Sequence, residues 1–129
     1  MNELVVLGAQ ESGTGAALLA KKRGIPVFVS DAGHIKADYK KILLEHDIEF
    51  EEGGHSANRV LGASEIVKSP GIPDSASLVR AATEKMIPVI SEIEFASRYT
   101  NAKIIGITGS NGKTTTTLLI GHMLKKAGL

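Results

Sequence analysis

Two glycine-rich segments of this sequence carry residue types that can bind phosphate. The longer one reads Gly109-Ser110-Asn111-Gly112-Lys113-Thr114-Thr115 and lies between an expected strand and an expected helix. The backbone N–H groups of such a loop and the positive end of the helix dipole point at one spot, which favours a polyphosphate. Lys113 can reach the β and γ phosphates of ATP, and the Thr114 hydroxyl can ligate Mg²⁺. We therefore predict an ATP- and Mg²⁺-binding loop, with Lys113 and Thr114 as the catalytic candidates.

This loop departs from the common phosphate-loop pattern. The pattern has an earlier glycine at the position of Ile107, whereas this segment has Gly109 instead. A structural turn that contains Gly-Lys-Thr by chance is therefore the alternative. The expected strand at 103–108 and the expected helix at 114–127 favour the nucleotide loop, because they give it the required context.

The shorter glycine-rich segment, Gly8-Ala9-Gln10-Glu11-Ser12-Gly13, follows a first apolar strand. It is similar to the dinucleotide pattern G-x-G-x-x-G, but Gln10 replaces the middle glycine, where the backbone approaches a pyrophosphate. Binding of NAD or FAD is thus disfavoured, and an NAD- or NADP-dependent oxidoreductase stays an alternative. Asp31 ends the second expected strand, in the place where an acid can bind a ribose hydroxyl or a base N–H. A solvated turn residue is the other interpretation of Asp31.

Short apolar strands that alternate with helices must position these loops. Such strands indicate a parallel sheet covered on both faces. Asp74 or Ser75 is the expected N-cap of the helix at 75–85. We expect strands at 4–7, 26–30, 48–51, 65–68 and 89–90, and helices at 16–23, 39–46, 57–61, 75–85 and 92–98.

The predicted fold class is α/β, with two units. Residues 1–100 form an open, doubly wound, Rossmann-like parallel sheet. Residues 101–129 form the first strand, the phosphate loop and the helix of an ATP-binding domain.

The composition narrows the classes of function. Of the 129 residues, 43% are apolar and 22% are charged, which is typical of a globular domain. A net charge of +1 with dispersed Lys and Arg disfavours nucleic-acid binding. The sequence has no cysteine, no membrane-spanning apolar run and no secretory signal, so we expect a cytoplasmic protein without a membrane partner. The four histidines lack the spacing of metal ligands.

The segment Ile107–Thr115 resembles the phosphate loop of the Mur ligase family, T-G-[ST]-x-G-K-[ST], which also lacks the early glycine. Two further segments resemble the D-glutamate-adding branch of that family. They are Lys68-Ser69-Pro70-Gly71-Ile72-Pro73 and Ser91-Glu92-Ile93-Glu94-Phe95. The resemblance covers the whole first domain of the family and the opening of its second domain.

The resemblance implies an ATP-dependent ligase of peptidoglycan precursor synthesis, with ATP and Mg²⁺ as cofactors. ATP would phosphorylate the carboxylate of UDP-N-acetylmuramoyl-L-alanine, and the amine of D-glutamate would attack the acyl phosphate to form an amide. The first glycine loop would then bind UDP. By position, the implied UDP contacts are Gly8, Glu11, Ser12, Gly13 and Asp31, with Ser69, Pro70 and Gly71 in the facing wall.

Several alternatives stay open. Another ligase of the same family is one alternative, and a uridine-nucleotide-binding module without catalysis is another. A plain turn at the end of a strand is the alternative for 69–73. We interpret Glu92 and Glu94 as solvated or capping residues, because two positions apart they do not share a helical face.

The chain has 16 residues after Lys113, too few for a complete nucleotide-binding domain. We therefore expect the fragment alone to be inactive. We also expect the apolar stripe of the last helix to be covered by a second copy of the chain, or that segment to be poorly ordered. The stripe consists of Ile120, Met123, Leu124 and Ala127.

Overall fold

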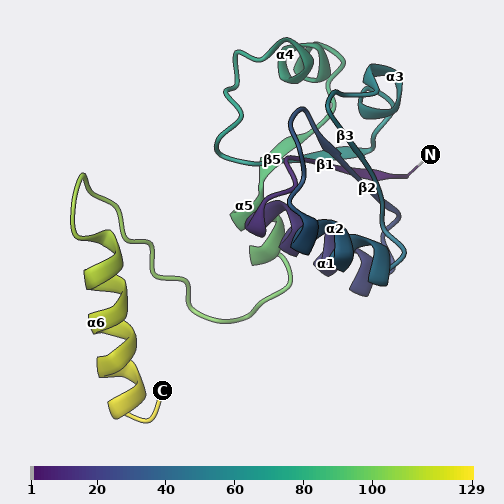
Figure 1. The fold of residues 1–129 in the computed structure, drawn as a ribbon. Coiled ribbons are helices and arrows are strands. Elements are labelled where there is room, and N and C mark those ends of the chain that lie inside the picture. Colours follow the sequence, from purple (N-terminus) through teal and green to yellow (C-terminus); the bar gives the residue numbers. More distant parts are fainter. Residues whose placement is uncertain (1) are drawn as a thin grey trace.

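The computed structural model describes residues 2–129 and contains one five-stranded sheet in which every strand pairing is parallel. The spatial order is β3-β2-β1-β4-β5, with β1 in the centre (Figure 1). Val5 of β1 lies opposite Phe28 of β2 and Ile66 of β4. The predicted α/β class is confirmed, and the strands are Leu4–Leu7 (β1), Val27–Asp31 (β2), Glu49–Glu52 (β3), Glu65–Lys68 (β4) and Val89–Ser91 (β5).

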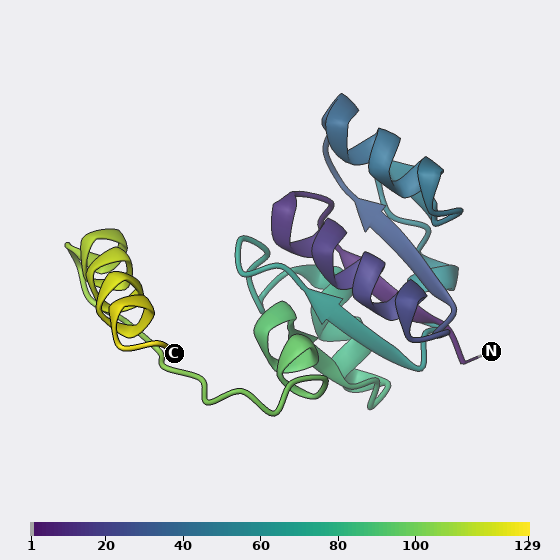
Figure 2. The same ribbon diagram turned by 90° about the horizontal axis from the view of Figure 1, so that it is seen from below.

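Helices cover both faces of the sheet, as the continuous apolar strands predict. One face carries α1 (Glu11–Lys22), α2 (Ala37–Glu45) and α5 (Glu92–Ser97). The opposite face carries α3 (Ala57–Val60) and α4 (Ser77–Glu84). Seen from below, the purple α1, blue α2 and green α5 lie over the strands (Figure 2). The result is a three-layer sandwich whose sheet is its middle layer.

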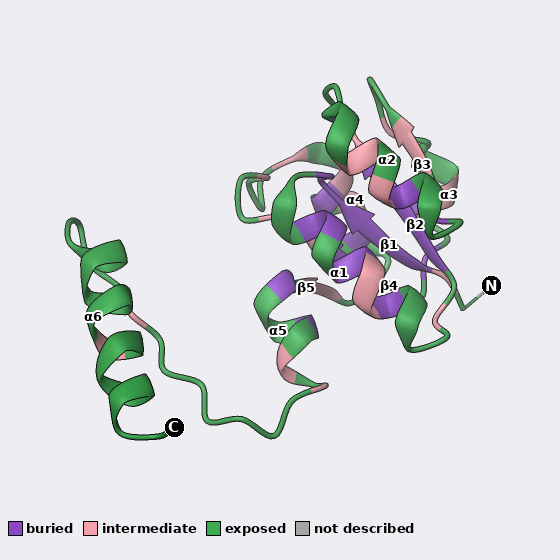
Figure 3. Ribbon diagram, turned by 60° about the horizontal axis from the view of Figure 1, so that its bottom comes forward, coloured by how far each residue is buried: buried purple, intermediate pink, exposed green. Residues whose placement is uncertain are grey.

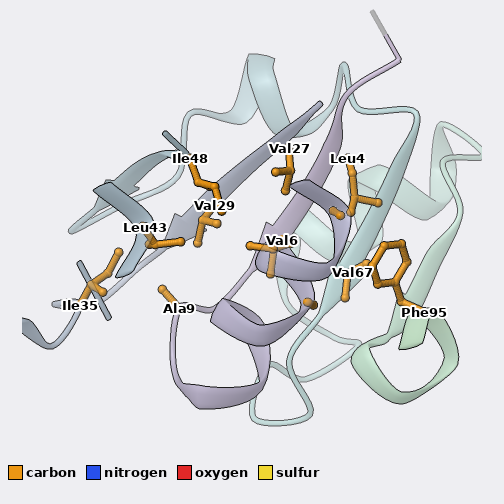
Figure 4. Packing of buried hydrophobic residues seen from close by; sticks show 13 residues of the cluster. Leu4, Val6, Ala9, Val27, Val29, Ile35, Leu43, Ile48, Val67 and Phe95 are labelled. Carbon is orange, nitrogen blue, oxygen red and sulfur yellow. The ribbon is translucent and has the colours of Figure 1, made fainter. Parts of the chain in front are cut away.

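The two apolar cores follow from the alternation of side chains along β1. Leu4 and Val6 belong to the core on the α1 side, whereas Val5 and Leu7 belong to the core on the α4 side. Figure 3 shows the buried residues concentrated in the central strands and on the inner sides of the helices. Figure 4 shows the first core, in which Phe95 of α5 packs near Val67 of β4.

Two helix starts differ from the expectation. The helix expected to begin at Ala16 begins at Glu11, because Gly13 packs tightly beneath the loop and this packing outweighs the low helix propensity of glycine. The N-cap of α4 is Ala76 and not Asp74 or Ser75, and no side chain caps that helix. Asp74 instead lies 3.2 Å from the ammonium of Lys68.

The strand expected at 103–108 is absent, which corrects that prediction. This segment has no strand pairing in the described chain, and Ile104 and Ile105 are 59% and 56% exposed. The reason is that an isolated strand has no partner for its backbone N–H and C=O groups, whatever its β-propensity.

The last helix, α6 (Lys113–Lys126), forms close to the expected range and lies apart from the sheet (Figure 1). None of its residues is buried, and Met123 is 61% exposed. That a second copy of the chain covers this apolar stripe stays a prediction. Within residues 2–129, no helix is long and apolar enough to span a membrane.

An ion pair at the amino end of the sheet leads to a pH prediction. The Glu3 carboxylate accepts hydrogen bonds from Nε and Nη2 of Arg59 at 3.0 and 2.8 Å, and these lower the pKa of Glu3 below its usual 4.5 although partial burial raises it. Because the folded pKa lies below the unfolded value, this contribution to stability is present above pH 4.5 and is lost as the pH falls through the folded pKa.

Glu3→Gln should therefore lower the free energy of unfolding at pH 7 by about 1 kcal/mol or less, since the pair is partly exposed. The difference from the unchanged chain should shrink below pH 4, as urea midpoints at pH 7 and pH 3 can show. Glu45→Gln is the control, because Glu45 lies 3.8 Å from Lys41 in an exposed pair. A Glu3→Gln effect of equal size at both pH values would contradict the prediction.

Candidate functional site

The candidate site lies where the order of the strands reverses. From the central β1 the chain first adds β2 and β3 on one side and then β4 and β5 on the other. The connections after β1 and β4 therefore leave the carboxyl edge of the sheet in opposite directions and open a crevice between them. Open α/β sheets bind their ligands in such a crevice.

The first glycine loop is locked into this edge by its neighbours. Gly8 N–H donates to the carbonyl of Ser30 at 2.9 Å, and Ser69 N–H donates to the carbonyl of Leu7 at 3.0 Å. Gly8 has a φ of +97°, which other residues rarely adopt. A Cβ on Gly13 would lie 1.9 Å from the Gly8 carbonyl oxygen. Both glycines are thus required by the backbone path of the loop.

The amino end of α1 points free N–H groups out of the same edge. Hydrogen bonding along α1 starts at Thr14, whose N–H donates to the Gln10 carbonyl at 2.9 Å. The N–H groups of Glu11, Ser12 and Gly13 precede it and have no helical acceptor, and no side chain caps the helix. Such a helix start attracts an anion.

Asp31 ends β2 beside this loop, as expected, but it has a role that the sequence did not indicate. Its Oδ2 accepts a hydrogen bond from Ala9 N–H at 2.7 Å, and its Oδ1 accepts one from Gly33 N–H at 2.8 Å. The carboxylate therefore ties the glycine loop to the loop after β2. Each oxygen keeps a second lone pair, so a ribose or base contact stays a prediction.

The turn after β4 faces the glycine loop. Ile72 N–H donates to the Ser69 carbonyl at 3.0 Å, which makes 69–72 a tight turn. The Ser69 hydroxyl oxygen lies 2.7 Å from where a Cβ on Gly8 would be. Pro70 and Gly71 are exposed at the tip of the turn. The structure thus brings Ser69 against the glycine loop. The segment is a tight turn, and it also borders the crevice on the side opposite α1.

Glu92 lies in a different environment from the one expected. It is only 7% exposed, and its Oε1 accepts hydrogen bonds from the hydroxyls of Ser12 at 2.9 Å and Ser69 at 2.6 Å. The interpretation of Glu92 as a solvated or capping residue is therefore wrong. Glu94 is exposed as expected and lies 3.5 Å from Arg98. The signal for Glu92 was its position directly after β5, because parallel strands end at one edge.

Another polar cluster adjoins Asp31. The buried Ser30 hydroxyl lies 2.6 Å from Glu51 Oε1 and 2.6 Å from His55 Nδ1. Burial raises the pKa of Glu51, but hydrogen bonds from Ser30 and Ser56 outweigh it, so the pKa lies below the usual value and the carboxylate is ionised. Ser30 then donates to Glu51 and accepts from His55. Sequence reasoning missed this cluster.

Several hollows lie along the sheet and its helices. One of about 200 Å³ between α1 and α5 is lined by Ser12 and Glu92. A cleft of about 600 Å³ beside the turn after β4 includes Lys68, Pro70 and Ser91 in its lining. A hollow of about 540 Å³ lies at the opposite, amino ends of β2 and β3, next to Phe28 and Arg59. No group of acidic, histidine or cysteine residues that could hold a metal ion occurs within residues 2–129.

The second glycine loop leads into the uncapped start of α6, and no strand precedes it. Gly112, with a φ of +78°, is the N-cap of α6, and no side chain caps this helix. The Lys113 ammonium folds over the loop and donates to the Gly109 carbonyl at 2.6 Å. Residues 109–115 are exposed throughout, including Thr114. The free helix N–H groups and the ammonium therefore lie at one accessible place.

Comparison with known proteins identifies one family for the crevice-forming region. Residues 4–78 match the family described as the MurD N-terminal domain. A curated relative, the UDP-N-acetylmuramoylalanine--D-glutamate ligase of Bacteroides fragilis, is 59% identical over 129 residues, which is 100% of this chain and 29% of the relative. The chain thus spans less than a third of the length of that relative.

Solved structures show the same architecture. A pseudomurein peptide ligase type C from Methanothermus fervidus is 29% identical, with a TM-score of 0.66 over 100% of this chain and 27% of that one. The UDP-N-acetylmuramate:L-alanyl-gamma-D-glutamyl-meso-diaminopimelate ligase from Neisseria meningitides is 25% identical, with a TM-score of 0.69 over 100% of this chain and 41% of that one.

Proposed function

Since this chain belongs to the MurD N-terminal domain family, we propose that residues 1–100 bind the uridine diphosphate part of a peptidoglycan precursor. The longer protein would be an ATP-dependent ligase that joins D-glutamate to UDP-N-acetylmuramoyl-L-alanine through an acyl phosphate. One observation carries the proposal. The free N–H groups at the start of α1 and the Asp31 carboxylate lie next to each other at one edge of the sheet.

These two groups suit the two ends of a nucleoside diphosphate. The N–H groups of Glu11, Ser12 and Gly13 can donate to phosphate oxygens, as free helix starts do. The Asp31 carboxylate, held by the loops on either side, can accept from a ribose hydroxyl or from a base N–H. The turn at 69–72 bounds the crevice opposite α1.

The second loop fits the polyphosphate of ATP. Polyphosphate needs hydrogen-bond donors. Here they are the free N–H groups at the start of α6, which follow the left-handed Gly112, and the adjacent Lys113 ammonium. Lys113 would neutralise phosphate charge, and the Thr114 hydroxyl would hold Mg²⁺. When bound, ATP supplies the phosphoryl group that activates the carboxylate. The other residues needed for ligation would come from the rest of a longer protein, so this chain by itself would bind without catalysing.

The proposal predicts that this chain binds UDP more tightly than NADH, as titration calorimetry can measure. Gln10 stands where a dinucleotide site needs glycine, whereas a single nucleoside diphosphate requires only the helix start and Asp31. NADH binding at least as tight as that of UDP would contradict the assignment of the first domain.

In the same titration, Asp31→Asn should weaken UDP binding about tenfold, the effect of losing one charge-assisted hydrogen bond. Asparagine keeps one carbonyl oxygen, so it preserves part of the loop bonding that alanine would remove. Asp38→Asn is the control, because Asp38 is exposed in the first turn of α2. Equal UDP affinity in both variants would remove Asp31 from the binding site.

A further inference from the structure

We propose that Glu92 is a positioning residue of this nucleotide site, because it holds the two walls together and orients the Ser12 and Ser69 hydroxyls. This inference rests on the proposed function, since it concerns how the same crevice binds UDP. Ser12 belongs to the first turn of α1, and Ser69 begins the turn after β4. Glu92 is the first residue of α5, so one carboxylate joins three connections at the edge of the sheet.

The two hydrogen bonds to Glu92 have a specific geometry. A single oxygen, Oε1, accepts both hydroxyls, from Ser12 at 2.9 Å and from Ser69 at 2.6 Å. The Ser69 side chain also occupies the space next to Gly8. Any shift of Glu92 would therefore move α1 and the turn at 69–72 relative to each other and change the width of the crevice.

Glu92 is itself held firmly. It is nearly buried, and Phe95, one turn later in α5, is only 1% exposed within the core. The Phe95 ring also packs edge-on against Tyr99, with 5.2 Å between the ring centroids. Because α5 is anchored by this aromatic pair, the carboxylate is a fixed point against which the two loops are aligned.

The arrangement also decides which ligand atoms each serine can contact. A serine hydroxyl has one proton, and in both serines it is donated to Glu92. Ser12 and Ser69 therefore present lone pairs to the crevice and can accept from N–H or O–H groups of a ligand. Phosphate oxygens, which are acceptors, must bind the backbone N–H groups at the start of α1 instead. The implied contact of Ser12 with the diphosphate then runs through its N–H group.

Two substitutions of matched size separate positioning from packing. Glu92→Met keeps the length and volume of the side chain but provides no oxygen acceptor. Glu92→Gln keeps a carbonyl oxygen that can accept both hydroxyls. Glu94→Gln is the control, since Glu94 is exposed on the same helix and contacts neither serine.

The 129-residue chain is titrated with UDP and with uridine, and binding is measured from the shifts of the amide NMR signals. We expect Glu92→Met to weaken UDP binding about tenfold and uridine binding by less than twofold, because the misplaced N–H groups serve the diphosphate. Glu92→Gln should stay within threefold of the unchanged chain for both ligands. Glu94→Gln should match the unchanged chain.

A Glu92→Met chain that is folded and binds UDP normally would overturn the proposal, as would equal losses for UDP and uridine. If Glu92→Met does not fold, Ser69→Ala takes its place, because it removes the shorter hydrogen bond without touching Glu92. Ser69→Ala should reproduce the selective loss of UDP affinity, and a normal UDP affinity there would also overturn the proposal.

UDP binding by the unchanged chain tests the proposed function, and hydrogen exchange without ligand tests the positioning role of Glu92 separately. If the unchanged chain binds no UDP, the nucleotide assignment is wrong. The positioning role is then judged in the ligand-free chain from amide hydrogen exchange at Thr14, whose N–H donates to the Gln10 carbonyl, and at Ser69, whose N–H donates to the Leu7 carbonyl. Glu92→Met should speed both, and Glu92→Gln should speed neither. Unchanged exchange in Glu92→Met would overturn the positioning role.

Discussion

Lys113→Ala should lower the turnover of a complete ligase carrying this chain by about 10³-fold, the scale of losing a group that stabilises transition-state charge. The Lys113 ammonium lies over the Gly109 carbonyl at the free end of α6, where phosphate would bind. No other lysine lies within residues 104–124, so the remaining loop offers only neutral donors. Phosphate release with UDP-N-acetylmuramoyl-L-alanine, ATP and D-glutamate measures the effect.

The same substitution should leave UDP affinity unchanged, because the first glycine loop and Asp31 belong to a different unit of the chain. Lys125→Ala is the matched control, since it removes a lysine from the last turn of the same helix, far from the loop. Near-normal turnover in Lys113→Ala would exclude the loop from the mechanism. A parallel loss in Lys125→Ala would indicate that α6 needs its charges for folding.

Gly13→Ala should destabilise the first domain by about 3 kcal/mol, the upper part of the range for an overpacked site. The added Cβ would lie 1.9 Å from the Gly8 carbonyl oxygen and 3.0 Å from its carbon. The backbone of one loop residue therefore has to move, and α1 must tilt away from β1. Denaturant midpoints measure the loss, and UDP affinity should fall at least tenfold because the helix start is displaced.

Gly15→Ala provides a sharp control for Gly13→Ala. Gly15 lies two residues later in the same helix, and an added Cβ there meets nothing within 4 Å. Alanine should therefore stabilise the helix by about 0.5 to 1 kcal/mol. Two alanines in one helix with opposite effects would locate the constraint at the contact with Gly8. A similar effect of both variants would indicate that helix propensity alone governs α1.

Patterns within single segments were sufficient to predict most of the fold. Unbroken apolar runs such as Leu4–Leu7 predicted buried parallel strands, and Glu65–Lys68 was placed at its exact bounds. These predictions succeeded because burial on both faces of a sheet leaves a mark in each strand. The strand at 103–108 failed for the converse reason. Its composition favours a strand, but pairing requires a neighbour, which local sequence cannot supply.

By itself, the sequence predicted which residues could do chemistry, and it determined the edge of the sheet at which those of the first glycine loop and the strand ends lie. The first glycine loop, Asp31 and Ser69 lie at or directly after the ends of strands, and parallel strands end at a common edge. Only the tertiary structure decided how these groups contact one another. Glu92 accepts from Ser12 across 80 positions and from Ser69 across 23, and Asp31 accepts from Ala9 across 22. Such contacts depend on strand order and register, which place β1 between β2 and β4, and no short sequence pattern encodes that order.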